Sequence, residues 1–258
     1  MVSDPDSIDA TPEFVDPPVQ PVARRSPALS LLEVLLCSGF PTMVLIGTLL
    51  VLAGVVTPGK DGLTFPIIVT VSLIDAVVVL SLILLFLRIG GERPSDVLLG
   101  SGSRLREVWR GIAWMPLVFT VVLAVGAVLK WLAPWKHNEQ NPFQLLMTSP
   151  GRIALFALVA VVAGGIREEV QRGFILHRFD QDLGGAKLGL VLFSVAFGLG
   201  HYEQGYDAMV ITGVLGMLWG MLYLGRRSVI GPAVSHALFN LIQIALFQYA
   251  SRHGLLPS

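Results

Sequence analysis

The chain has 258 residues, of which 53% are hydrophobic and only 14% are charged. Soluble domains carry about 25% charged residues, so this composition excludes one large soluble core and favours a polytopic membrane protein. The formal net charge is +0, without the basic surplus typical of nucleic-acid binding, and we expect no nucleic-acid partner.

The apolar segments divide the chain into two membrane regions with a short tail at each end. Residues 1–28 are polar and Pro-rich and lack the apolar core of a signal peptide, which predicts a disordered cytoplasmic tail. Residues 29–150 are predicted to hold N-terminal transmembrane helices and loops, and residues 251–258 a short tail. Residues 151–250 form a second transmembrane region, which carries most of the polar motifs.

The hydropathy predicts an all-α fold, a polytopic transmembrane helical bundle with about seven spans, since a helix needs about 20 apolar residues to cross the hydrocarbon core. The predicted spans are Leu31–Val56, Leu63–Leu87, Gly111–Leu132, Arg152–Asp182, Lys187–Gly200, Ala208–Leu224 and Val229–Tyr249. Pro41 is expected to kink the first span. The fourth is expected to form one long helix that ends at Gly184-Gly185.

The distribution of Lys and Arg predicts the orientation in the membrane. The Arg-rich segment 88–110 and Arg226-Arg227 should face the cytoplasm, which places the N-terminus inside. We therefore expect an integral protein of a bacterial-type cytoplasmic (plasma) membrane.

Three polar clusters lie in or beside apolar segments, where ionisable side chains are costly and mark functional sites. They are Arg167-Glu168-Glu169 with Arg172, then Phe197 to His201, and then His236 to Asn240. Each cluster alone is more often a solvated helix end or a structural histidine, but their combination predicts one intramembrane hydrolytic site. A further charge, Asp75, is either a proton or ion site or a buried hydrogen-bonded residue.

The helical spacing leaves two arrangements open for the carboxylates. Arg172 is an i,i+4 neighbour of Glu168 and an i,i+3 neighbour of Glu169, so it can hold either one while the other faces another surface. A carboxylate in such a site is suited to act as a general base for water, and His201 can share that water. His236 and Asn240 are also i,i+4 on one face and can bind a developing oxyanion.

A metal cofactor is left open by the sequence. Glu168, Glu169, His201 and His236 are candidate ligands for zinc, yet catalytic zinc usually takes three firm protein ligands. The same residues suit glutamate chemistry without a metal.

The order Glu-Glu…Arg, Phe-xxx-His and His-xxx-Asn resembles the CPBP family of intramembrane proteases (CAAX protease and bacteriocin-processing, also called ABI), which includes the type II CAAX prenyl endopeptidases. The resemblance covers about residues 150–245 and implies a catalytic core there. It implies cleavage near the cytoplasmic face of a membrane-tethered or lipidated peptide. By this resemblance Glu168 or Glu169 with His201 activates water, while His236 and Asn240 stabilise the oxyanion. Supporting positions are Arg172, Arg167 and Phe197. Members of the family are often called metalloproteases.

The chain departs from the family pattern in one spacing. The family has Glu-Glu-xxx-Arg, whereas only two residues separate Glu169 from Arg172. Alignment on Arg172 places Arg167 at the first glutamate, and alignment on the glutamate pair shifts Arg172 by one. Two alternatives therefore stay open: a catalytically inactive membrane scaffold or immunity factor, and an ion-coupled transporter that uses Asp75.

Overall fold

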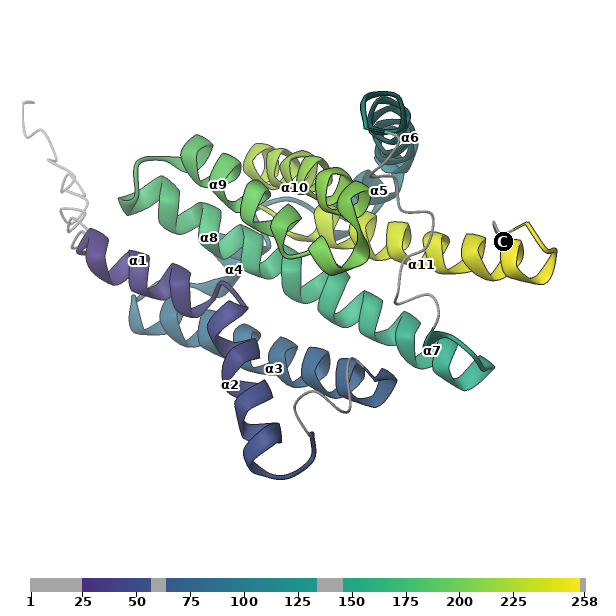
Figure 1. Cartoon of the computed structure of the whole chain (residues 1–258). Coiled ribbons are helices and arrows are strands. Elements are labelled where there is room, and N and C mark those ends of the chain that lie inside the picture. The colour runs from purple at the N-terminus through teal and green to yellow at the C-terminus, as the bar shows by residue number, and fades with distance from the viewer. Residues whose placement is uncertain (1–24, 57–63, 134–145, 256–258) are drawn as a thin grey trace, which may run out of the picture.

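The computed structural model describes residues 25–56, 64–133 and 146–255, and every regular element in these ranges is helical (Figure 1). The predicted all-α membrane bundle is thus confirmed. The helices are α1 (Pro27–Leu36), α2 (Phe40–Leu52), α3 (Phe65–Ile89), α4 (Pro94–Leu98), α5 (Arg104–Ala113), α6 (Met115–Leu132), α7 (Pro150–Val159), η3 (Ala160–Arg167), α8 (Glu168–Asp182), α9 (Ala186–Leu199), η4 (Tyr202–Gln204), α10 (Tyr206–Arg226) and α11 (Ile230–Arg252). Most of the predicted tail of residues 1–28 lies outside the described residues, and the division near residue 150 stays a prediction.

Among the described residues, four helical stretches are long and apolar enough to cross a membrane, or five if the bent pair α1–α2 forms one span. This is fewer than the seven predicted spans. The helix α9 has 14 residues, or about 21 Å at 1.5 Å per residue, which is shorter than a hydrocarbon core of about 30 Å. The predicted fourth span falls short because its apolar part ends at Ile166, where a charge-rich stretch follows.

The predicted kink near Pro41 is confirmed as a break between α1 and α2. The two helices meet at an angle of 46°. Pro41 lies in the first turn of α2, where a missing backbone N–H costs nothing. Gly39 precedes it in the left-handed region, with φ of +85°, and this turns the chain.

The predicted long helix is also confirmed, and it organises the bundle. It runs as α7, η3 and α8 without interruption and ends at Gly184 and Gly185, both with positive φ. Its middle part, η3, is a π-helix, a form that is frequently found at functional sites. Figure 1 shows α7 and α8 crossing the middle of the molecule, with α9 and α10 on one side and α2 and α3 on the other.

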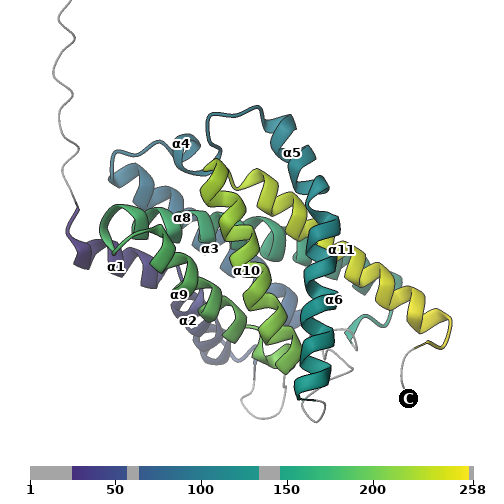
Figure 2. The same cartoon turned by 90° about the horizontal axis from the view of Figure 1, so that it is seen from above.

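The helices α9, α10 and α11 pack around the long helix, and the other polar motifs lie at the end of α9 and on α11. The helix α11 packs against η3 and α5, and α10 packs against α9. In the view from above, α6 lies at the edge of the bundle, where it packs against α10 and α11 (Figure 2). The three polar clusters of the sequence thus come from helices that surround one space.

Candidate active site

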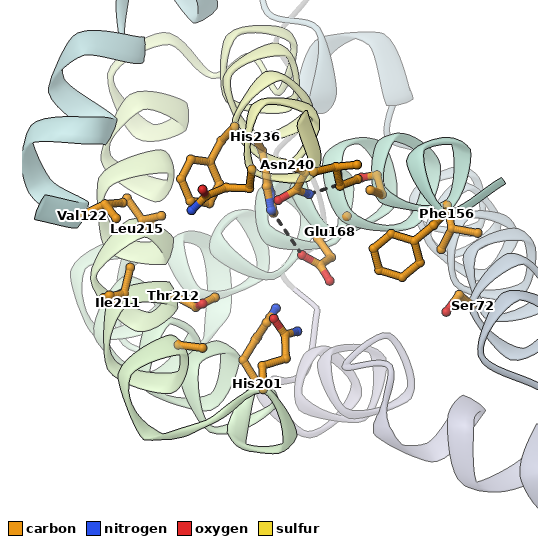
Figure 3. A pocket seen from close by; sticks show the side chains of 18 of the residues that line it. Ser72, Val122, Phe156, Glu168, His201, Ile211, Thr212, Leu215, His236 and Asn240 are labelled. Carbon is orange, nitrogen blue, oxygen red and sulfur yellow. Dashed lines mark hydrogen bonds and ion pairs between the residues drawn. The ribbon is translucent and has the colours of Figure 1, made fainter. Parts of the chain in front are cut away.

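A cavity of about 470 Å³ lies between α3, α7 and η3 on one side and α10 and α11 on the other. This volume is in the range of ligand-binding pockets. Four of the five predicted catalytic residues line it: Glu168, His201, His236 and Asn240 (Figure 3). The structure therefore brings together side chains that are up to 72 positions apart, from 168 to 240, in the sequence.

The two adjacent glutamates face different surroundings. The side chain of Glu168 lines the cavity and is 18% exposed, whereas that of Glu169 is 1% exposed. Because successive helical residues are about 100° apart, one glutamate faces the cavity while the other faces the protein interior. Of the two arrangements left open by the sequence, the structure has the i,i+3 pair: Arg172 forms its ion pair with Glu169.

Arg172 is completely buried and surrounded by aromatic rings. Its guanidinium carbon lies 4.6 Å from the ring centre of Phe197, 5.4 Å from Phe193 and 5.7 Å from Trp219. Cation–π attraction and the carboxylate of Glu169 together compensate the buried charge. Phe197, predicted as a supporting residue, thus contacts the arginine of the motif.

The ring of His236 is held by a hydrogen bond at Nδ1 and by stacking on an aromatic ring. Its Nδ1 lies 2.8 Å from Oε1 of Glu169, and its ring stacks on Trp219 with 3.9 Å between the ring centres. A carboxylate only accepts hydrogen bonds, so Nδ1 carries a proton. The other nitrogen, Nε2, lies 3.9 Å from Oε2 of Glu168, which lines the cavity (Figure 3).

Sequence reasoning missed Trp219, since nothing in its span distinguishes it from other buried aromatic residues. Its indole Nε1 donates a hydrogen bond to the hydroxyl of Ser235, over 3.2 Å. Ser235 is completely buried, and this bond gives its hydroxyl a role in orienting Trp219.

Asn240 lies one turn beyond His236 and faces the same cavity. Its Nδ2 donates a hydrogen bond to the carbonyl of Ala160, the first residue of η3, over 3.3 Å. A Cβ at Gly164 would lie 2.6 Å from that nitrogen. Gly164 was also missed, although the pair Gly164-Gly165 directly before the charged motif was a usable signal of close helix approach.

His201 follows the end of α9 and enters the cavity from the opposite side. Its Nδ1 lies 2.8 Å from the carbonyl oxygen of Phe197. Because a carbonyl only accepts, Nδ1 carries a proton, and Nε2 is the nitrogen that can accept when the ring carries no second proton. The short helix α9 thus places the imidazole of His201 at the cavity that Glu168 also lines.

Binding of a metal depends on how the donor side chains are arranged in space. Among residues 25–56, 64–133 and 146–255, no group of three or more His, Cys, Asp or Glu side chains is arranged to hold a metal ion. One carboxylate oxygen of Glu169 is already shared by His236 and Arg172. These residues do not fit a three-ligand zinc site.

Arg167 and Asp75 lie apart from the cavity lining. Their side chains form an ion pair with each other, 2.5 Å between Nη2 and Oδ2. Arg167 is therefore not among the groups that the structure brings to the cavity, although it was predicted as a supporting residue.

Comparison with known proteins gives a match for the part of the chain that contributes the motif residues of this cavity. Residues 150–242 match the family model described as type II CAAX prenyl endopeptidase Rce1-like. Comparisons with curated proteins and with solved structures give no significant match. The match includes every cavity-lining residue predicted from the three motifs. It confirms the predicted resemblance, since residues 150–242 of this integral membrane protein are similar to the Rce1-like family of type II CAAX prenyl endopeptidases.

Proposed function

We propose that the protein is an intramembrane endopeptidase that hydrolyses a peptide bond of a membrane-associated substrate. The observation that carries the proposal is the convergence of Glu168, His201, His236 and Asn240 on one cavity. The Rce1-like family supports proteolysis at the level of the family. The cavity adds a set of groups that suits water activation on one side and oxyanion binding on the other.

In the proposed reaction, the carboxylate of Glu168 accepts a proton from a water molecule, and Nε2 of His201 orients that water. The water oxygen attacks the carbonyl carbon of the scissile peptide bond. The C–N bond then breaks, and the leaving amine takes the proton from Glu168.

The oxyanion would be stabilised by Nε2 of His236 and Nδ2 of Asn240. His236 can donate from Nε2 while its Nδ1 is bonded to Glu169 only when both nitrogens carry protons. The buried carboxylate of Glu169 lies 2.8 Å from Nδ1 and accepts the hydrogen bond of that nitrogen. Glu169 is then a positioning residue, and Glu168 is the base.

This assignment favours the alignment on the glutamate pair, because Glu168 and not Arg167 lines the cavity. The first family glutamate is then present. The shorter spacing to Arg172 suits an i,i+3 pair with Glu169, the pair that the structure contains.

The substrate is proposed to be membrane-tethered, with a lipidated or hydrophobic peptide end. The cavity has apolar walls, which include Phe156, Ile211 and Phe239, next to its polar groups. Prenyl specificity does not follow from these walls. We further propose a bacterial-type cytoplasmic membrane, an N-terminus inside and a site near the cytoplasmic face.

The proposal is tested with a library of membrane-tethered peptides and the purified protein, with and without a chelator. We expect cleavage by the wild type and none by His201→Ala. Cleavage that persists with chelator is the result expected from a metal-free site, and its loss would show a metal requirement. A folded wild type that cleaves no member of the library would favour the scaffold or immunity alternative, and ion flux that depends on Asp75 would favour a transporter.

Gly164→Ala should reduce cleavage without unfolding the protein. The new Cβ would meet the end of a flexible side chain, Asn240, which can move away. A misplaced oxyanion donor of this kind costs about 10- to 100-fold in kcat. Gly151→Ala is the matched control, since a Cβ there meets nothing within 4 Å. Equal kcat for the two variants would contradict the role of Asn240.

A further inference from the structure

Two charged residues, Asp75 and Arg167, lie inside the protein and take no part in the proposed reaction. Asp75 is in the middle of α3 and 5% exposed, and Arg167 is the last residue of η3 and 9% exposed. Their ion pair joins the N-terminal helices to the residue directly before Glu168. A buried pair of this kind costs desolvation energy, so it contributes little net stability.

A second polar contact lies one turn further along the same helix. Gln171 accepts a hydrogen bond from Nη1 of Arg167 over 3.1 Å and donates one to the carbonyl of Cys37 over 2.6 Å. Cys37 follows the last residue of α1, where helix carbonyls lack partners within the helix. The break between α1 and α2 thus receives a donor from α8.

The break between α1 and α2 lies directly against the guanidinium of Arg167. A Cβ at Gly39 would collide with that guanidinium. Thr42, in the first turn of α2, contacts Asp75 through its hydroxyl group. Three N-terminal elements, α2, α3 and the α1–α2 break, therefore enclose one side of the long helix.

The position of these contacts determines how the helix is rotated. Arg167 and Gln171 are i,i+4 and share one face, whereas Glu168 and Glu169 point about 100° and 200° away from Arg167. The π-helix that precedes them has more residues per turn than an α-helix, so α7 alone does not set the rotation at Glu168. Contacts at residues 167 and 171 hold one face of the helix against the N-terminal elements where α8 begins.

We propose that Asp75, Arg167 and Gln171 form a positioning clamp that holds Glu168 toward the cavity and Glu169 toward His236. The inference rests on the proposed function in one respect, namely that Glu168 is the base. It gives Asp75 and Arg167 a role as positioning residues.

The test uses the full-length protein with the double substitution Asp75→Asn and Arg167→Gln. A single substitution would leave one buried charge unpaired, whereas the double variant removes both charges. Glutamine is shorter than arginine and cannot span to residue 75 and donate to Gln171 at once. The matched control is Asp180→Asn with Arg227→Gln, which removes an exposed pair that also involves α8.

Two measurements are made on each variant. The first is labelling of carboxylates with a hydrophobic carbodiimide, followed by mass spectrometry of the modified positions. In the wild type and the control, we expect label on Glu168 and not on Glu169. In the double variant, we expect labelled Glu169 and less labelled Glu168, because the contacts of the helix start with α2, α3 and the α1–α2 break are weakened.

The second measurement is cleavage, with kcat and KM determined separately. We expect the double variant to lose about tenfold or more in kcat with little change in KM, as for a misplaced base. Labelling of Glu168 alone together with wild-type kcat would overturn the clamp. If the wild type cleaves nothing, the proposed function fails, yet the labelling pattern still decides whether the clamp orients the glutamates.

If the double variant does not fold, the same two measurements are made on Arg167→Lys. Lysine keeps the ion pair with Asp75, but its single ammonium group does not reproduce the two-sided contact of the guanidinium. We expect this variant to fold and to show labelling of both glutamates. A wild-type labelling pattern and wild-type kcat in Arg167→Lys would overturn the clamp as well.

Discussion

Glu168→Gln should abolish peptide cleavage while the protein stays folded and still binds substrate. Glutamine has nearly the same shape as glutamate but cannot accept a proton from water, so only the base is removed. General-base catalysis contributes about 10²- to 10⁴-fold, and we expect a loss of kcat in this range. The effect is measured as initial rates on one peptide from the library, with kcat and KM determined separately.

The matched control is Glu203→Gln, since Glu203 lies in the nearby η4 and is exposed. It should leave kcat unchanged. Thermal unfolding in detergent should be the same for both variants, because Glu168 is not one of the groups that neutralise Arg172. A Glu168→Gln protein that cleaves at the wild-type rate would remove Glu168 from the mechanism.

Arg172→Met should cause the largest loss of stability of any single substitution in the site. It leaves the carboxylate of Glu169, only 1% exposed, without its cation. Removing one partner of a buried ion pair costs about 3–5 kcal/mol. Methionine fills the space between Phe193, Phe197 and Trp219 with a flexible side chain that packs well on aromatic rings, so the loss reports on charge rather than on a cavity.

The double variant Glu169→Gln with Arg172→Met distinguishes loss of the charge of Arg172 from loss of its aromatic contacts. It removes both charges, and we expect it to regain most of the lost stability, because neutral replacements of buried pairs are often tolerated. Unfolding of both variants is followed in the same detergent. If the double variant is as unstable as Arg172→Met, the aromatic contacts of Arg172 and not its charge hold this part of the core.

The helical fold and the three motifs were predictable because they depend on local features. Hydropathy identified the apolar helices, and the i,i+4 spacing placed His236 and Asn240 on one face. The number of spans was less predictable. The predicted span Lys187–Gly200 agrees in length with α9, but 14 residues are too few to cross a hydrocarbon core, and the long helix is apolar only as far as Ile166.

The orientation of the glutamates was not predictable from local spacing. It is seen only in tertiary contacts, such as that of Glu169 with His236, which is 67 positions away in the sequence. Both alignments with the family are therefore open from the sequence alone. The stacking of Trp219 on His236 is a tertiary contact of the same kind, and it carries no signal in the sequence.

The measurement that tests the central claim most directly compares cleavage by Glu168→Gln with cleavage by the double variant Glu169→Gln and Arg172→Met. Both proteins are assayed on the same tethered peptide, at matched folded fraction. We expect the double variant to retain measurable cleavage, because Glu168 still faces the cavity, while Glu168→Gln loses about 10²- to 10⁴-fold in kcat. Cleavage by Glu168→Gln together with an inactive, folded double variant would contradict the assignment of Glu168 as the base.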